Sequence, residues 1–448
     1  MLVYQKIQFI FMCLIRNKLA DTGLLICGLV SVLWYWKIYD LGIIGEKIPE
    51  FFSLYLVVFV LYVIAIFFIR FSSLKLKGRV AFILFFGLIY RLLLLPTAPT
   101  LSNDIYRYAW EGYLQTEGIS PYQHSPNSKA LFDYRNEFWP SVNNKDVPAI
   151  YPPMTQIVNA FVFLGFRTIF GFKIAFLIIE GFLIITILSI LKLRGQSLER
   201  ILIYVWNPLV IVEIAGSGHH DVLVVSLLLG ALFLIEKRKI LPSILFFSGA
   251  ILSKFYPLIM ILTFLKGLSI RYWAILIVSL VTISLPYLFA GKNFFEGLKI
   301  YGQNWRFYGS LFPTISDQVS SEAATMFIIM FLLFGLIMIF WFSRHCRLRQ
   351  MFWLTGAIIL FTPTLYPWYL IWMIPYLCFF HNPAWLLLSG LSMVSYEVLI
   401  DWKIIQVWQQ DPLFVKLQYY PFYGFLLFGF ILELFRKFQV NQNKTSKF

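Results

Sequence analysis

Apolar stretches long enough to cross a membrane recur along almost the whole chain, separated by short segments that carry charge. The first three run at about 21–36, 51–70 and 80–98. Because a helix of about 20 apolar residues crosses the hydrocarbon core of a bilayer, the pattern predicts an all-α, polytopic integral membrane protein. We expect about 12–14 transmembrane helices in a single domain, residues 1–438, followed by a disordered cytoplasmic tail, residues 439–448.

One polar island interrupts this pattern early in the chain. It covers Leu101–Pro126 and reads LSNDIYRYAWEGYLQTEGISPYQHSP. Ser102 or Asn103 can cap a helix here, and Gly118 with Pro121 can end it about four turns later. The island therefore predicts a short polar helix beside the membrane.

Three ionisable residues of this helix, Asp104, Arg107 and Glu111, fall at i, i+3 and i+7 and so share one face. Two carboxylates and a guanidinium side by side next to a membrane surface indicate a functional site. A structural alternative stays open, in which Asp104 only pairs with Arg107, and Glu111 holds Arg107 or a backbone amide.

Composition agrees with the membrane class. Of 448 residues, 60% are hydrophobic and only 13% are charged, and a soluble protein of this composition would have no polar surface left to cover its core. The formal net charge is +15, but the basic residues gather in short loops between apolar runs, as the positive-inside rule produces. We therefore expect membrane lipids, and no nucleic acid, as partners. The four cysteines lack paired spacing, so no disulfide framework is predicted.

The basic loops also predict the orientation. The N-terminal segment and loop 70–79 are basic and hence cytoplasmic, so residues 99–151 form a large first external loop with interfacial helices. For residues 152–191, the charge rule favours an interfacial or re-entrant helix at about 154–168 and one span at about 173–191, over two spans. Every later basic loop then falls inside, and both termini are cytoplasmic.

Four further polar segments fall on the external side in this scheme: GSGHHD at 216–221, KFYP at 254–257, the loop 291–322, and YPWY at 366–369. The apolar stretches on either side of Lys254 are too short to cross alone, which predicts half-helices broken at that residue. Ionisable groups at membrane depth are costly and usually functional. The candidates for one external cavity are Asp104, Arg107, Glu111, His219, His220, Asp221, Lys254, Trp305 and Arg306.

Structural explanations, without a role in catalysis or binding, stay open for several of these residues. The HHD sequence looks like a set of metal ligands, but adjacent residues point in different directions and the motif alone is a weak zinc signal. Lys254 can extend toward lipid headgroups, and Trp368 and Tyr369 can belong to an interfacial aromatic belt. Arg91, inside the third span, is expected to pair with a neighbouring carboxylate or to reach the interface.

Seven motifs that follow one another along the chain resemble the GT-C glycosyltransferases. They are NDIYRYAWEG…GISPY from 103, YPP at 151–153, WNPL at 206–209, GSGHHD at 216–221, KFYPL at 254–258, NWRFYGS at 304–310 and YPWYLIW at 366–372. In particular, the chain is similar to bacterial polyprenyl-phosphate-hexose mannosyltransferases and, more distantly, to the first mannosyltransferase of GPI-anchor synthesis.

The resemblance implies an inverting transferase that takes a hexose, with mannose expected, from a polyprenyl-phosphate donor. The acceptor would be a lipid-linked or cell-envelope glycan on the periplasmic face of a bacterial inner (plasma) membrane. By position, Asp104 is the acidic catalytic residue of the first external loop. Many relatives carry two consecutive acids where this sequence has Asn103 and Asp104, which weakens the expectation of an acidic metal pair. A divalent cation, Mg²⁺ or Mn²⁺, stays open as a cofactor.

Physical reasoning supports these roles independently. Inverting transfer needs a base for the acceptor hydroxyl, and the helix dipole favours an ionised carboxylate in the first turn. The leaving lipid phosphate needs fixed positive charge, for which Lys254, Arg107 and Arg306 are candidates. The predicted catalytic residue is Asp104, the predicted substrate-binding residues are Arg107, Trp110, Glu111, Tyr151, His219, Asp221, Lys254, Trp305, Arg306, Trp368 and Tyr369, and no metal ligand is assigned.

Other functions stay open. A lipid-linked oligosaccharide ligase or polymerase also uses external loops and a lipid-phosphate leaving group, but it usually has a large arginine-bearing loop late in the chain. A lipid or solute transporter would favour inverted repeats and charged residues at the midplane, and neither is clear here. An inactive protein with the same fold is the remaining alternative.

Overall fold

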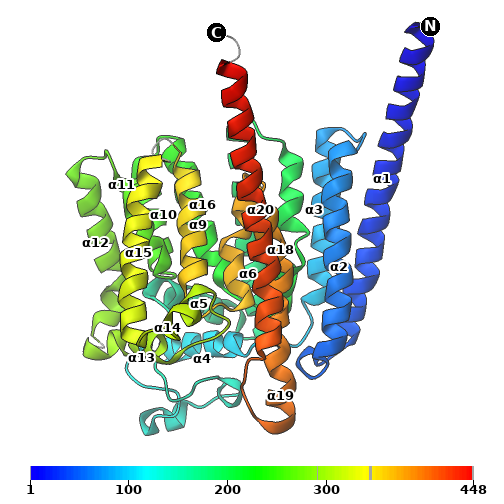
Figure 1. Cartoon of the computed structure of the whole chain (residues 1–448). Helices are drawn as coiled ribbons and strands as arrows, with labels where there is room; N and C mark the ends of the chain where they lie inside the picture. Colours follow the sequence, from blue (N-terminus) through cyan, green and yellow to red (C-terminus); the bar gives the residue numbers. More distant parts are fainter. Residues whose placement is uncertain (1, 290, 343–345, 446–448) are drawn as a thin grey trace.

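A computed structural model of the chain describes residues 2–289, 291–342 and 346–445, and the regular secondary structure of these residues is helical throughout (Figure 1). The prediction of an all-α fold is confirmed. The α-helices are α1 (Leu2–Asp40), α2 (Ile48–Phe68), α3 (Leu76–Leu94), α4 (Asp104–Thr116), α5 (Pro153–Phe166), α6 (Ile169–Leu193), α7 (Leu202–Val205), α8 (Pro208–Ile211), α9 (Asp221–Glu236), α10 (Ile240–Ile251), α11 (Ile261–Leu265), α12 (Ile270–Leu288), α13 (Glu296–Asn304), α14 (Leu311–Ser316), α15 (Ser321–Phe342), α16 (Arg347–Phe361), α17 (Ile374–Leu377), α18 (Pro383–Leu391), α19 (Val398–Ile405) and α20 (Pro412–Thr445).

Within the described residues, six helical segments are long and apolar enough to cross a membrane, and a bent pair makes a seventh if it counts as one span. The six are Lys18–Asp40, Ile48–Phe71, Ile169–Leu193, Ile270–Leu288, Glu322–Trp341 and Pro383–Ile405. This confirms a polytopic membrane protein, and the number of these candidates is below the 12–14 expected. Three further apolar helices of the described residues, Pro153–Phe166, Ile240–Ile251 and Tyr256–Leu265, are too short to be included.

Two breaks in apolar runs shape the centre of the bundle. The segments Pro208–Gly216, which ends in a π-helix, and Asp221–Glu236 meet at an angle of 117°. The second break lies between α10 and the 3₁₀-helix Tyr256–Met260, with Lys254 in the gap, as predicted. The expected short helix and single span at 152–191 are also confirmed, as α5 and α6.

The basic loops gather at one end of the bundle. Arg79 pairs with Glu199 at 2.5 Å, and Arg194 pairs with Glu236, so the loops before α3, after α6 and after α9 meet. In Figure 1, α1 and α20 project from one end, and α4 lies at the opposite end with the residues that follow it. We call the latter the site end. The last helix continues to Thr445, through 439–445 where we expected disorder, and 446–448 lie outside the described residues.

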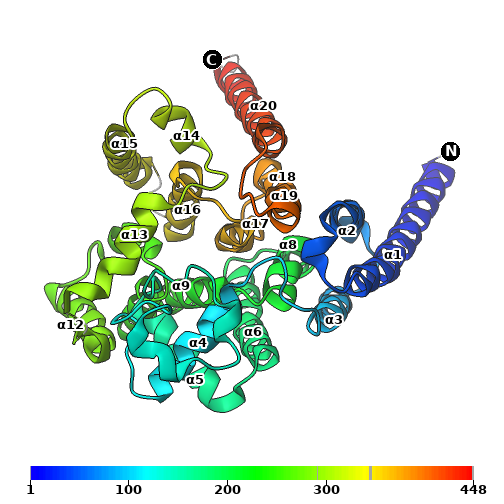
Figure 2. The same cartoon turned by 90° about the horizontal axis from the view of Figure 1, so that it is seen from below.

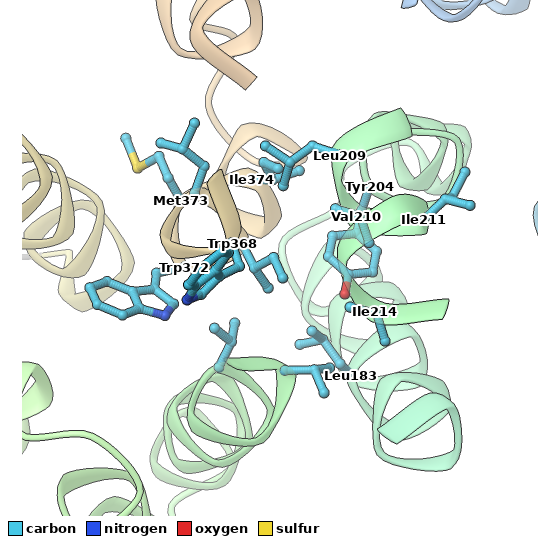
Figure 3. Packing of buried hydrophobic residues seen from close by; sticks show 14 of the residues in the cluster. Leu183, Tyr204, Leu209, Val210, Ile211, Ile214, Trp368, Trp372, Met373 and Ile374 are labelled. Atoms are coloured by element: carbon cyan, nitrogen blue, oxygen red, sulfur yellow. The ribbon is translucent and has the colours of Figure 1, made fainter. Parts of the chain in front are cut away.

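The core lies around the first break. Every residue from 201 to 225 is buried, so GSGHHD sits inside the protein. Figure 3 shows Leu209 and Ile214 in the same apolar cluster as Trp368 and Ile374, which come from the segment 367–377. Burial on all sides explains why this stretch is apolar almost throughout.

Helix α4 begins and ends where the sequence predicted. Ser102 Oγ accepts a hydrogen bond from the Asp104 amide at 3.3 Å, whereas Asn103 makes no capping bond with its side chain. The chain leaves the helix through Gly118, whose φ of +77° is the left-handed conformation that glycine adopts without strain. Figure 2 shows α4 lying beside α5, on which it packs.

Candidate active site

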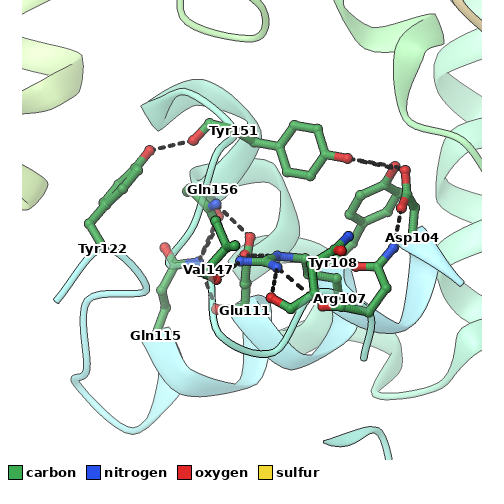
Figure 4. A network of polar contacts seen from close by, with 11 residues as sticks. Asp104, Arg107, Tyr108, Glu111, Gln115, Tyr122, Val147, Tyr151 and Gln156 are labelled. Carbon is green, nitrogen blue, oxygen red and sulfur yellow. Dashed lines mark hydrogen bonds and ion pairs between the residues drawn. The ribbon is translucent and has the colours of Figure 1, made fainter. Parts of the chain in front are cut away.

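Asp104 opens α4, and its carboxylate accepts hydrogen bonds from three side chains (Figure 4). Asn143 Nδ2 donates to Oδ1 at 2.6 Å, while the hydroxyls of Tyr151 and Tyr108 donate to Oδ2 at 3.2 Å and 3.4 Å. None of the ion pairs among the described residues includes Asp104. The carboxylate is therefore oriented by neutral donors and keeps its capacity to take up a proton.

The two phenols beside Asp104 act only as donors toward it. Burial, together with the charge of Asp104, raises the pKa of Tyr108 and the pKa of Tyr151 well above the ordinary value of tyrosine. Both hydroxyls therefore stay protonated at neutral pH, and the carboxylate keeps both bonds.

Arg107 does not pair with Asp104. Its Nε donates to Glu111 Oε1 at 2.8 Å, and its terminal nitrogens donate to the backbone carbonyls of Asn143, Asn144 and Val147. Glu111 also accepts a hydrogen bond from Gln156, at 2.6 Å. Arg107 and Glu111 are both buried, so the pair fastens α4 to α5 and to the segment 143–147. The structural alternative for Glu111, in which it holds Arg107, is what the structure shows.

The HHD sequence follows the bend before α9, and its two histidines meet different neighbours. The His220 ring lies edge-on to the rings of Tyr108 and Tyr151, with centroids 4.1 Å and 4.5 Å away. His219 stacks on Trp368 at 3.9 Å. Gly218 makes the bend possible, because a Cβ there would lie 2.3 Å from Ile105 Cδ1 and φ is +75°.

An ion pair joins the two breaks. Lys254 Nζ lies 2.6 Å from Asp221 Oδ1, and Trp372 Nε1 donates to the same oxygen at 2.7 Å. The ammonium group also lies over the rings of Tyr369, Trp372 and Tyr151, at 4.7, 5.1 and 5.8 Å from their centroids. Tyr151 thus contacts Asp104 with its hydroxyl and Lys254 with its ring.

The remaining predicted residues lie beside this cluster or apart from it. Tyr369 shares a hydrogen bond of 2.7 Å with Tyr301, against whose ring Trp305 packs at 5.3 Å. Trp368 is buried behind His219, and Trp110 is buried within α4, so neither belongs to an exposed aromatic belt. Arg306 is exposed and lies over the Phe312 ring, 4.8 Å from its centroid.

The structure brings Asp104, Tyr151, His220, Asp221, Lys254 and Tyr369 into one contiguous cluster. Sequence reasoning missed Asn143, Tyr108 and Trp372, which touch Asp104 or Asp221 directly. Tyr108 could have been found, because it lies four residues after Asp104 and so on the same helix face. Asn143 had no such signal, since it comes from an irregular segment.

These residues do not form a metal centre by themselves. Among the residues that the structure describes, no group of three or more His, Cys, Asp or Glu side chains could hold a metal ion. Asp221 is engaged by Lys254 and Trp372, and Asp104 by neutral donors. The divalent cation stays a prediction, and the roles of Asp104 and Lys254 do not depend on it.

A polytopic helical fold, with Asp104 at the start of α4, fits the class of GT-C membrane glycosyltransferases. The chain belongs to the family described as alpha-(1->6)-mannopyranosyltransferase, N-terminal domain, whose model matches residues 23–271. The matched part contains Asp104, Asn143, Tyr151, Asp221 and Lys254.

A curated relative supports the same family. The chain is 27% identical over 169 residues to the alpha-(1->6)-mannopyranosyltransferase A of Mycobacterium tuberculosis. The match covers 36% of this chain and 32% of that protein, so it spans about a third of the relative's length.

Proposed function

We propose that this protein is an inverting mannosyltransferase that moves mannose from a polyprenyl-phosphate donor to a lipid-linked or cell-envelope glycan. Membership of the mannopyranosyltransferase family supports the sugar and the class of reaction. The observation that carries the proposal is the placement of Asp104, an oriented carboxylate that forms no ion pair with the side chains that the structure describes, one tyrosine away from the ammonium group of Lys254.

Asp104 is the base of the reaction. As the acceptor hydroxyl approaches the anomeric carbon of the mannosyl group, its proton passes to the Asp104 carboxylate. The new bond forms between the acceptor oxygen and the anomeric carbon while the bond to the donor phosphate breaks on the opposite face. The configuration inverts, and the polyprenyl phosphate leaves with the electron pair.

Lys254 stabilises the phosphate that leaves. An ammonium group has three donors, and its hydrogen bond among the described side chains goes to Asp221. The other two N–H groups are available for phosphate oxygens, whose negative charge grows in the transition state. Asp221, held in turn by Trp372, keeps the lysine aimed at the cluster.

The aromatic side chains around Lys254 supply walls for the sugar. Tyr369 and Trp372 stack on each other at 4.5 Å, and Trp305 lies nearby against Tyr301, itself bonded to Tyr369. Flat apolar rings suit the C–H faces of a hexose, while the surrounding hydroxyls suit its O–H groups. Arg306, at the exposed edge, is the candidate for contact with the acceptor.

The site end faces the periplasm in this proposal. The support is the collection of basic loops at the opposite end, which the positive-inside rule assigns to the cytoplasm. The test replaces Lys129, which is exposed, by cysteine in a variant from which the four native cysteines have been removed. An impermeant maleimide should label it in intact spheroplasts, and labelling only after lysis would reverse the orientation.

The decisive experiment compares wild-type protein with Asp104→Asn in purified membranes. Each receives labelled polyprenyl-phosphate mannose, polyprenyl-phosphate glucose or a nucleotide sugar, together with an envelope lipid extract as acceptor. We expect transfer from polyprenyl-phosphate mannose that falls by about 10²–10⁴-fold in the variant, the range for loss of a general base.

A matched control is Asp133→Asn, which alters an exposed carboxylate of the same loop, outside the segment 143–147. It should transfer mannose at the wild-type rate. Full activity of Asp104→Asn would remove Asp104 as the base. Transfer from the nucleotide sugar alone would contradict the proposed donor.

A further inference from the structure

Hydrogen bonds to the segment 143–147 link two residues of α4 whose side chains do not pair with each other, Asp104 and Arg107. From this connection we infer that Asn143 is a positioning residue for the base, that Arg107 holds Asn143 in place through the backbone of 143–147, and that Oδ1 of Asp104 is the atom that receives the proton. The inference rests on the proposed function, because it assumes that Asp104 is the base.

The choice of oxygen follows from the hydrogen bonds that Asp104 already makes. Each carboxylate oxygen has two lone pairs. Among the side chains that the structure describes, Oδ2 accepts both phenolic hydroxyls, from Tyr108 and Tyr151, whereas Oδ1 accepts the amide of Asn143 alone. The lone pair that stays available for an acceptor hydroxyl is therefore on Oδ1, beside Asn143. At 2.6 Å, the Asn143 bond is the shortest of the three.

Arg107 is suited to holding the segment and not to binding substrate. Its terminal nitrogens reach the carbonyls of Asn143 and Asn144 at 3.3 Å and that of Val147 at 2.6 Å, while Glu111 takes its Nε. Its guanidinium is thus surrounded by protein acceptors, and its side chain is 4% exposed. A planar fork with several donors is required for this arrangement, and the single ammonium of lysine cannot reproduce it.

The segment needs this support because it has little regular structure of its own. Asn144 adopts a φ of +46°, in the left-handed region, and Val147 closes the turn by donating to the carbonyl of Asn144. Arg107 and Asp104 are three residues apart on one helix. The same helix therefore carries the base and the anchor of the group that orients the base, which keeps their spacing constant.

The test measures the pH dependence of mannosyl transfer in wild-type protein and in Asn143→Ala. Loss of a hydrogen bond to the charged carboxylate should move the acidic limb of kcat/KM to higher pH by about one unit and lower the rate near neutral pH by about tenfold. His220 and Lys254 lie against the two tyrosines that bind Asp104. The other titratable groups that interact with the charge of Asp104 are Tyr108, Tyr151, Glu213, Asp221, Tyr301, Tyr366 and Tyr396. They are shared by both proteins, so the shift reports Asn143.

A second readout does not depend on transfer. A hydrophobic carbodiimide reacts with protonated carboxyl groups, and mass spectrometry of the peptide with Asp104 gives the labelled fraction at each pH. In Asn143→Ala, labelling should persist to a pH about one unit higher than in wild type. Arg107→Lys should produce the same shift, because it releases the segment without touching Asp104.

The matched control is Asn136→Ala, which removes another asparagine of the loop, one whose Oδ1 accepts a hydrogen bond from the Phe138 amide at 3.1 Å. It should leave both profiles unchanged. Slower transfer in Asn143→Ala with an unmoved acidic limb and unmoved labelling would assign Asn143 a merely structural role and overturn the inference. A shifted labelling profile in a protein without mannosyl transfer would keep the inference about Asn143 and refute the proposed function instead.

Discussion

Two buried ion pairs in this protein look alike in composition and differ in how completely they are bonded. Arg91 of α3 binds both oxygens of Glu180 of α6, at 2.6 Å and 2.7 Å, and two further donors go to the carbonyls of Gly87 and Val205. Within the described residues, the Lys254 ammonium group donates one hydrogen bond, to Asp221, and otherwise faces aromatic rings.

The difference separates a structural pair from a functional one. Four of the five N–H donors of Arg91 are bonded within the described part of the chain, so the pair fastens α3, α6 and the segment before α8 together. Lys254 has donors to spare and is somewhat more open, with its side chain 11% exposed against 6% for Arg91. Arg107 with Glu111 resembles the first kind, which is why we assign it to positioning.

The largest effect is expected at the saturated pair. Glu180→Gln would leave the Arg91 guanidinium buried without a counter-charge, and breaking such a pair costs about 3–5 kcal/mol. We expect a strongly lowered melting temperature in detergent, measured by size-exclusion chromatography after heating.

The double variant Arg91→Leu, Glu180→Leu is the control, since it removes both charges together. It should recover much of the lost stability, because an apolar pair of similar size can replace a buried ion pair. A Glu180→Gln protein as stable as wild type would show that the comparison between the two pairs is mistaken.

A large effect on activity is expected at the unsaturated pair. Lys254→Met removes the charge while keeping most of the side-chain volume, and should lower transfer from the polyprenyl-phosphate donor by about 10²–10³-fold, as for other lost electrostatic contacts to a developing charge. Initial rates over a range of donor concentrations measure it, with folding checked by the same melting assay.

The surface variant Lys129→Met serves as its control and should behave as wild type. If Lys254→Met melted far below wild type and kept its transfer rate per folded molecule, Lys254 would belong with Arg91 as a structural residue.

The smallest effect is expected from Tyr151→Phe, which sharpens the claim that neutral donors hold the base. Removing one long hydrogen bond should slow transfer by about fivefold, roughly 1 kcal/mol.

Burial raises the pKa of Tyr151 well above its ordinary value, so the phenol loses its proton only at high pH. The wild-type pH–rate profile should therefore show no alkaline limb due to this residue below about pH 10. An alkaline limb near pH 8 that vanishes in Tyr151→Phe would contradict this.

Several features of the site could be predicted from neighbouring residues. The bounds of α4, the break at Lys254 and the single span after α5 all follow from caps, run lengths and the placement of basic residues, which act over a few positions along the chain. The pairing of Arg91 with some carboxylate was also expected, because a charge at membrane depth requires a partner.

The partners themselves could not be predicted. Glu180 is 89 positions from Arg91, Trp372 is 151 from Asp221, and Asn143 is 39 from Asp104. No local pattern relates residues so far apart. Helix spacing places Asp104 and Arg107 on one face, but it does not reveal that Arg107 binds Glu111 and the carbonyls of 143–147 instead of Asp104.

By itself, the sequence determined the class of protein, an all-helical membrane transferase, because apolar run length, charge placement and motif order are properties of the chain read in one dimension. Only the tertiary structure decided which charges are saturated and which are left for a substrate. That distinction depends on how many acceptors surround each donor in space, and packing alone brings those acceptors together.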